Sequence, residues 1–167
     1  KGPVSSLYGS DAIGGALDLR MSDARFVSVK NNLELFTEAG SFDTFRSALK
    51  YQTKEDRIGI VMDASYLHTD NDRPFSQFEN LTLRNNIAYE VSDNIYFDLL
   101  SFYQGSDLQV PGSELGGSFP EPQINVNESS LISPRLSITE KNWNAQIFFS
   151  RTASELEATQ DVFQQDN

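Results

Sequence analysis

The sequence predicts an all-β fold, an antiparallel up-and-down meander of about seven or eight strands, on three observations. Apolar and polar residues alternate along several segments. These segments are rich in β-branched and aromatic residues, and no apolar stripe recurs at the helical period of about 3.6 residues. Short and longer connections alternate between the segments, as in a meander whose turns lie at opposite ends. We therefore expect little helix.

In chain order, the expected strands cover residues 27–38, 42–53, 57–68, 78–91, 94–104, 130–140 and 142–153, and an eighth begins near Asp161. The clearest alternation lies in 78–91. One face carries Leu81, Leu83, Ile87, Tyr89 and Val91, and the other carries Thr82, Arg84, Asn86, Ala88 and Glu90. Residues 57–68 and 142–153 repeat the pattern, until Phe148 breaks the second. We expect the apolar set on a convex, lipid-facing side and the polar set on a concave side.

The connections differ in length and in charge. Those at 39–41, 54–56, 92–93 and 140–141 are short, whereas 69–77 and 105–129 are longer. Residues 105–129 and 152–167 each carry four acidic side chains and no basic one. Long loops gathered at one end are typical of outer-membrane barrels, which have short periplasmic turns and long extracellular loops. Four aromatic residues near strand ends are candidates for the interfacial girdles of such a barrel: Tyr51, Tyr66, Tyr89 and Trp143.

Composition excludes several functional classes. The 167 residues include 13 Lys and Arg against 24 Asp and Glu, a net charge of −11, which argues against nucleic acid as a partner. The chain has no cysteine and one histidine, His68, so disulfides, zinc ribbons, two-histidine metal sites and hydrolytic triads are not expected. No pair of carboxylates stands out, and we expect no enzymatic activity. No run approaches the roughly 18 apolar residues of a membrane helix, but the strands of a membrane barrel need only alternate.

The first 19 residues, KGPVSSLYGSDAIGGALDL, have no counterpart later in the chain. Their four glycines would allow close backbone approach and positive φ. The stretch resembles the end of the plug domain of TonB-dependent outer-membrane receptors. The matching positions are Lys1, Gly2, Pro3, Ser5, Tyr8, Gly9, Ala12, Ile13, Gly14, Gly15, Leu17, Asp18 and Leu19. Lys1 and Asp18 stand where the family more often has arginine and asparagine. The wording YGSDAIGG is especially similar to the cobalamin and haem receptor branches.

The resemblance implies two parts: residues 1–23 end a plug domain, and residues 24–167 begin a transmembrane barrel of roughly 22 strands. It implies energised uptake, across the outer membrane, of a large scarce nutrient such as cobalamin, haem or a metal chelate. The implied partners are outer-membrane lipid and the TonB-ExbB-ExbD complex, whose contact segment we expect upstream of Lys1. A plug lies inside its barrel, so we expect residues 1 to about 23 against the concave face.

Two other classes remain open. A passive outer-membrane porin or adhesin would explain the strands and loops but not the opening motif. A soluble β-sheet module that binds carbohydrate would need a sheet without a lipid-facing band.

A ligand or cation could bind at five charged residues of the longer connections: Asp70, Asp72, Arg73, Asp107 and Glu114. Their oxygens suit a loop-bound calcium ion. The EF-hand spacing is absent, which favours ordinary solvated loop residues over a calcium site. No other cofactor is expected.

Overall fold

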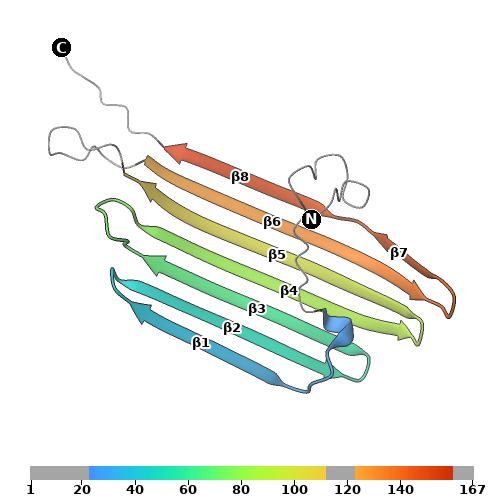
Figure 1. The fold of residues 1–167 in the computed structure, drawn as a ribbon. Coiled ribbons are helices and arrows are strands. Elements are labelled where there is room, and N and C mark those ends of the chain that lie inside the picture. The colour runs from blue at the N-terminus through green and yellow to red at the C-terminus, as the bar shows by residue number, and fades with distance from the viewer. Residues whose placement is uncertain (1–22, 112–122, 160–167) are drawn as a thin grey trace, which may run out of the picture.

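A computed structural model describes residues 23–111 and 123–159 (Figure 1). These residues form one antiparallel sheet of eight strands and one short 3-10 helix, which confirms the predicted all-β meander. The elements are η1 (Ala24–Phe26), β1 (Asn32–Gly40), β2 (Thr44–Glu55), β3 (Ile58–Thr69), β4 (Phe78–Ser92), β5 (Ile95–Val110), β6 (Gln123–Thr139), β7 (Asn144–Phe148) and β8 (Arg151–Thr159). None of the described residues belongs to a helix long and apolar enough to cross a membrane.

Consecutive strands are neighbours from β1 to β7, and β8 also pairs with β6. β7 and β8 continue one another in a single register along β6, with Phe148 opposite Arg135 and Arg151 opposite Ile132. The interruption between them lies opposite Pro134, whose carbonyl still accepts a hydrogen bond from the Phe149 amide. Proline has no N–H to return that bond, so the ladder breaks there. The predicted strand at 142–153 is therefore this broken edge strand, which continues to Thr159, and the eighth strand predicted near Asp161 lies outside the described residues.

The connections lie at two ends of the sheet, as predicted. One end, which we call the long-connection end, holds residues 41–43 and 70–77, together with the end of β5 at Val110 and the start of β6 at Gln123. The opposite short-turn end holds residues 56–57, 93–94 and 140–143. The long loop predicted at 105–129 is wrong at both borders, because β5 continues to Val110 and β6 begins at Gln123. These extensions pair residue by residue, and that pairing stabilises polar stretches with weak strand propensity of their own.

The two faces of the sheet differ sharply in character. The apolar face of β3, β4 and β5 carries Ile58, Ile60, Met62, Ala64, Tyr66, Leu81, Leu83, Asn85, Ile87, Tyr89, Phe97, Leu99, Ser101, Tyr103 and Gly105, none of them charged. The opposite, polar face carries four charged side chains on the same strands: Asp63, Arg84, Glu90 and Asp98. As predicted, Leu81, Leu83, Ile87 and Tyr89 lie on the face opposite to Arg84 and Glu90.

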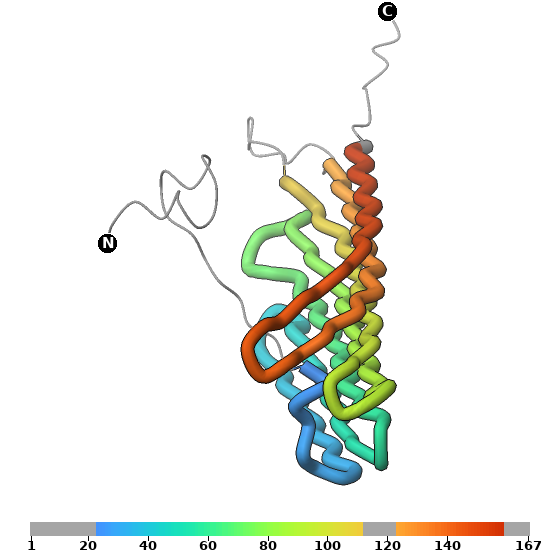
Figure 2. The backbone as a smooth tube through the Cα atoms, turned by 90° about the vertical axis from the view of Figure 1, so that its right-hand side faces the viewer, coloured from blue at the N-terminus to red at the C-terminus, as the bar shows by residue number. Residues whose placement is uncertain are grey.

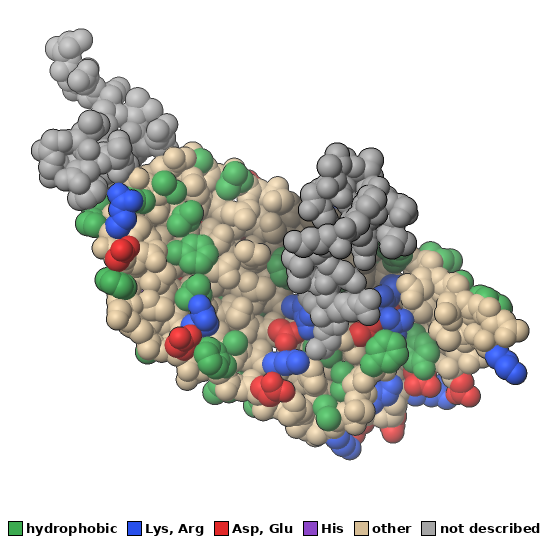
Figure 3. All heavy atoms as spheres, in the orientation of Figure 1, with side chains coloured by type: hydrophobic (Ala, Val, Ile, Leu, Met, Phe, Trp, Pro, Cys, Tyr) green, Lys and Arg blue, Asp and Glu red, His purple; other side chains and the backbone are tan. Residues whose placement is uncertain are grey.

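The exposure of side chains differs between the two faces of the sheet. Leu83 on the apolar face is 43 % exposed, whereas Asn86 and Asp98 on the polar face are only 5 % and 1 % exposed. Figure 3 shows apolar and charged side chains scattered over the visible face, among other side chains and backbone. The hydrophobic core among the described residues consists of Ala24, Val61 and Ala88, on this polar face. The contacts of η1 therefore bury polar and small apolar side chains together on the polar face, whereas large apolar side chains of the other face stay exposed.

The chain enters the sheet from its polar face. Figures 1 and 2 show η1 beside the sheet near the short-turn end. From η1 the chain runs along β2, where the Val29 carbonyl accepts from the Lys54 amide and the Asn31 amide donates to the Thr53 hydroxyl. The predicted plug residues Gly2, Pro3, Tyr8, Gly9, Gly14 and Gly15 lie outside the described residues. Of the predicted plug segment, only Asp23 is described, and it contacts the polar face.

Candidate functional site

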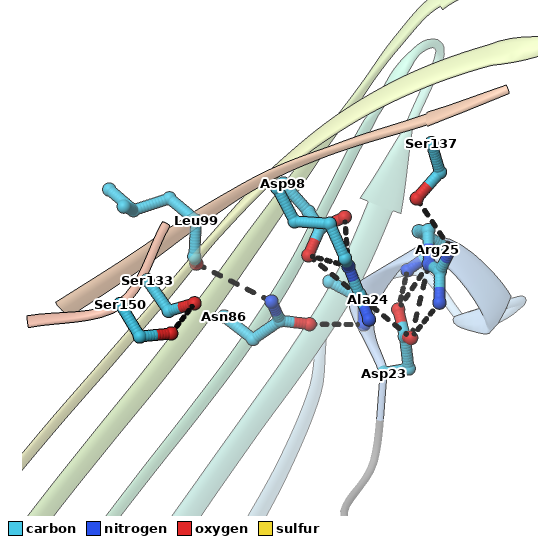
Figure 4. A network of polar contacts seen from close by, with 10 residues as sticks. Asp23, Ala24, Arg25, Asn86, Asp98, Leu99, Ser133, Ser137 and Ser150 are labelled. Carbon is cyan, nitrogen blue, oxygen red and sulfur yellow. Dashed lines mark hydrogen bonds and ion pairs between the residues drawn. The ribbon is translucent and has the colours of Figure 1, made fainter. Parts of the chain in front are cut away.

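The most elaborate contacts on the polar face hold η1. We name this site the η1 anchor and define it as Asp23, Ala24 and Arg25 of the entering segment with Gly59, Asn86, Asp98 and Arg135 of the sheet. The four sheet residues come from four neighbouring strands, β3 to β6. Three entering residues thus contact four neighbouring strands of the sheet (Figure 4).

Ala24 is the centre of the η1 anchor. It is 0 % exposed and packs with Val61 and Ala88. Its amide donates a 2.7 Å hydrogen bond to Oδ1 of Asn86, whose Nδ2 donates in turn to the Leu99 carbonyl at 3.4 Å. A buried backbone N–H needs such a partner, because leaving it unpaired costs about 1–3 kcal/mol. Asn86 therefore serves as the acceptor that lets a non-strand backbone lie on the sheet.

Gly59 supplies the space for this close approach. A Cβ at Gly59 would overlap the carbonyl oxygen of Ala24 and come to 3.0 Å from its carbonyl carbon. Its cross-strand partner Ala88 is the next smallest residue type. Glycine and alanine side by side thus form a shallow seat for the backbone of η1.

Four charged side chains surround this seat. Arg135 Nε lies 3.0 and 2.9 Å from the two carboxylate oxygens of Asp98, and Arg135 Nη2 lies 3.3 Å from Oδ2 of Asp23. Arg25 Nη2 lies 2.6 Å from the same Asp23 oxygen, and Arg25 Nη1 lies 3.3 Å from the Ser137 hydroxyl. Two arginines balance two aspartates, so the buried carboxylate of Asp98 is fully paired. Arg135 joins the wall of the sheet to the entering segment.

Asp23 also begins η1, since its Oδ1 accepts from the Arg25 amide at 2.9 Å. Burial acts to raise the pKa of the Asp23 carboxyl. The hydrogen bonds from the Arg25 side chain and amide, with the positive charges of Arg25 and Arg135, outweigh burial and hold this pKa below its ordinary value of 3.8. The hydrogen bond to Asp23 likewise raises the pKa of Arg25, against the opposing effect of burial. Both groups are therefore charged around neutral pH.

A hollow of about 390 Å³ opens beside the η1 anchor over β5, β6 and β7. Asp23, Asn86, Asp98 and Arg135 form one wall. The rest of the lining is Leu100, Leu131, Ser133, Gln146, Phe148 and Ser150. Its charged groups are already paired with one another, and the hydroxyls of Ser133 and Ser150 lie 2.9 Å apart. The lining of the hollow therefore combines apolar side chains with paired charges and neutral hydrogen-bonding groups.

The predicted ligand or cation residues lie elsewhere. Asp70, Asp72 and Arg73 are in the β3–β4 connection, and Asp107 is on β5 at the same long-connection end. Glu114 lies outside the described residues. Asp70 Oδ1 accepts from Gln77 Nε2 at 2.8 Å, and the Arg73 carbonyl accepts from the Ser76 hydroxyl at 2.6 Å, so both help to shape the connection.

At that end Asp70 lies 3.6 Å from His68 Nε2, measured from its Oδ1. His68 stands opposite Glu79, and Glu79 stands opposite Asp107. The fold thus brings several of the predicted acids to one end. Even so, no group of three His, Cys, Asp or Glu side chains that could hold a metal ion occurs within residues 23–111 and 123–159.

Sequence reasoning did not single out the η1 anchor. The alternation of residues 78–91 places Asn86 and Ala88 on the polar face, but it does not group Asp23, Asp98 and Arg135. One signal was available: Asp98 and Arg135 are charged residues on the polar face of their strands. A charge that becomes buried there needs a partner of opposite charge. The sequence could not show that this partner is Asp23, 112 positions before Arg135.

Comparison of the chain with protein families, curated proteins and solved structures finds no match.

Proposed function

We propose that this chain is the end of the plug domain and the beginning of the transmembrane barrel of a TonB-dependent outer-membrane receptor, which takes up a large scarce nutrient such as cobalamin, haem or a metal chelate. The proposal rests on two features together: the opening motif of residues 1–19, and a sheet whose apolar face is exposed while polar side chains are buried on the opposite face. The nutrient, the outer-membrane location and the energy-transducing partner TonB-ExbB-ExbD all belong to the proposal.

One observation carries it: the uncharged block on the apolar face. The block spans 58–66 of β3, 81–89 of β4 and 97–105 of β5. Its corners are in register, since Ile58 pairs with Tyr89 and Tyr89 with Phe97 at one end, and Tyr66 pairs with Leu81 and Leu81 with Gly105 at the other. Each stretch is nine residues long, and a tilted strand needs about 9–11 residues to cross a bilayer.

The borders of the block support the same reading. Beyond its long-connection end, the next residues on the apolar face are His68, Glu79 and Asp107. Beyond its short-turn end lie the turn residues Asp56, Arg57 and Asp93. Charges therefore reappear on both sides of an uncharged band, as they do where a membrane barrel leaves the hydrocarbon.

Aromatic residues fit this band in part. Tyr66 lies at the long-connection border, in contact with Phe45 at a centroid distance of 6.4 Å. Tyr89 and Phe97 pair with each other at the short-turn border, and Trp143 lies in the turn after β6. Tyr51 sits deeper, opposite Met62. Three of the four candidate girdle residues thus occupy positions expected of an interfacial aromatic.

The entry of the chain agrees with a plug inside a barrel. Asp23 and η1 lie on the polar face, which would be the interior of a closed barrel. The sheet surface there is built to receive a backbone, through Gly59 and Asn86. A porin or adhesin barrel would have no need for such a seat.

Nutrient uptake tests the proposal. Cells that need cobalamin, haem or a ferric chelate for growth are supplied with each nutrient in turn. We expect one of them to enter only when both the full-length protein and the TonB-ExbB-ExbD complex are present. Entry without the complex would instead indicate a passive porin. Recovery of the full-length protein from the aqueous fraction, free of membrane, would indicate the soluble carbohydrate-binding module.

A further inference from the structure

The apolar face continues beyond β3, β4 and β5 and can be compared from strand to strand. Residues that pair across neighbouring strands lie on the same face, so the pairings define rows that cross the sheet. One row joins Ala64 of β3 to Ala153 of β8 through the pairs of β4, β5 and β6. The row two residues closer to the short-turn end joins Met62 to Arg151 in the same way. These rows are a scale on which the charged side chains of different strands can be placed.

On this scale the charged border at the long-connection end is oblique. On β3, β4 and β5 the first acidic, basic or histidine side chains of the apolar face share one row: His68, Glu79 and Asp107. On β6 the first is Glu128, one row closer to the short-turn end, because it pairs with Gly105. On the edge formed by β7 and β8 the first is Arg151, in the row of Met62. From β3 to this edge the border therefore moves by six residues over four strand-to-strand steps.

The border at the short-turn end moves in the same direction. On β2, Glu55 lies in the row of Ile58. One row beyond that level, the apolar face of β5, β6 and β7 still carries Ile95, Ile138 and Ala145. Both borders thus approach the short-turn end on passing from β2 to β8. The uncharged surface of the described strands is therefore a slanted belt.

A slanted belt is the shape that a flat layer of hydrocarbon requires of tilted strands. Neighbouring strands lie about 4.8 Å apart, and residues advance by about 3.3 Å along a strand. A shift of six residues over four steps then corresponds to strands inclined by about 45° to the normal of the layer. Strands of membrane barrels are tilted by about 35–45°. A contact with a folded protein would not have to follow a plane with this constant slope.

We infer that the surface in contact with the hydrocarbon of a bilayer runs obliquely across the apolar face, from residues 45–53 of β2 to residues 145–149 at β7. The inference rests on the proposed function, because it defines the lipid contact of the proposed barrel. It places Ala64 inside the belt and Ala153 of the same row outside it. Arg151 and Glu155 then lie at the level of the lipid headgroups.

The two alanines of one row test the inference. Ala64→Cys and Ala153→Cys are introduced separately into the full-length protein in phosphatidylcholine bilayers. The 167 residues contain no cysteine, and any cysteine outside them is replaced by serine. Each variant reacts with a sulfonated maleimide, which is confined to water, and with a neutral maleimide, which enters hydrocarbon. The ratio of the two rates cancels the difference between half-buried Ala64 and exposed Ala153.

We expect the ratio of neutral to sulfonated rates to be about tenfold higher for Ala64→Cys than for Ala153→Cys, because a charged reagent is excluded from hydrocarbon. The same two variants unfolded in urea are the control and should give equal ratios. If Ala64→Cys prevents folding, Ser101→Cys replaces it, since Ser101 lies inside the belt and in the row of Arg151.

The outcomes separate this inference from the proposed function. Two equally high ratios would overturn the slanted belt and leave a lipid-facing sheet intact. Two ratios equal to those of the unfolded protein would show water over the whole apolar face and overturn both proposals. Protection of Ala64→Cys from both reagents would indicate a protein partner, such as a second copy, in place of lipid. Unequal ratios without uptake that depends on TonB-ExbB-ExbD would keep the belt and overturn the receptor.

Discussion

The two faces of β3, β4 and β5 differ in which side chains are exposed and which are buried. On the apolar face, fifteen neighbouring positions of β3, β4 and β5 carry no charge, yet many of their side chains are exposed. On the polar face, a charged and an amide side chain are almost completely buried, at Asp98 and Asn86. A folded chain in water normally buries its apolar side chains and pairs its few buried polar ones. The difference shows that burial here follows the contacts of η1, and the exposed apolar face supports the proposal that this face meets lipid.

A charge placed on each face in turn should have the largest effect. We expect Leu83→Arg to destabilise the full-length protein in lipid bilayers by about 2–4 kcal/mol, because an arginine near the middle of a lipid-facing band must leave water. Thr82→Arg, one residue away on the polar face, should cost less than about 1 kcal/mol. Unfolding by denaturant from bilayers measures both. Equal costs for the two variants would contradict a lipid-facing apolar face.

Added volume beneath η1 should have the next largest effect. Gly59→Ala places a methyl group where the Ala24 carbonyl lies, and we expect a loss of about 1–3 kcal/mol in the free energy of unfolding. Gly40→Ala is the control, since its new Cβ would have its nearest neighbour at an ordinary 3.6 Å. Hydrogen exchange of the Ala24 and Arg25 amides reports whether η1 has moved. A Gly59→Ala protein with unchanged exchange there would contradict the seat.

The alternation of faces was accessible from sequence, and the site was not. Residues 78–91 display their two faces in a pattern of period two, because each face has its own surroundings along the whole strand. The sequence did not predict the extensions of β5 and β6. Polar residues there, such as Asp107 and Asn125, are in strands only because the two extensions pair with each other. The η1 anchor was missed for a related reason. Its partners are far apart in the chain, and local patterns carry no information on such contacts.

Loss of the Asn86 acceptor should have a smaller effect than Gly59→Ala. Asn86→Ala leaves the buried Ala24 amide without a partner, and we expect a cost of about 1–2 kcal/mol. Asn80→Ala, on the same face of β4, removes only hydrogen bonds to the side chains of Thr82 and Gln104 and should cost less. Denaturant unfolding in bilayers compares the two. An Asn80→Ala protein less stable than Asn86→Ala would show that the amide of Ala24 has another acceptor.

The smallest effect concerns pH, and it isolates the charge on Asp23 from the packing of Ala24. The pKa of Asp23 is lower in the folded protein than its ordinary value of 3.8, so the folded state favours the charged carboxylate. Its contribution to stability is complete above the ordinary value and is lost as pH falls through the lower, folded value. The difference in unfolding free energy between the unchanged protein and Asp23→Asn should therefore be constant from about pH 7 to about pH 5 and shrink toward about pH 3. Other carboxylates titrate in both proteins and cancel in the difference.

Glu55→Gln is the control for this comparison. It should show little difference at any pH, because its ion pair with Lys30 is exposed. If the difference for Asp23→Asn instead grows as the pH falls, the folded protein binds the neutral carboxyl of Asp23. That outcome would contradict a stabilising ion pair between Asp23 and Arg135.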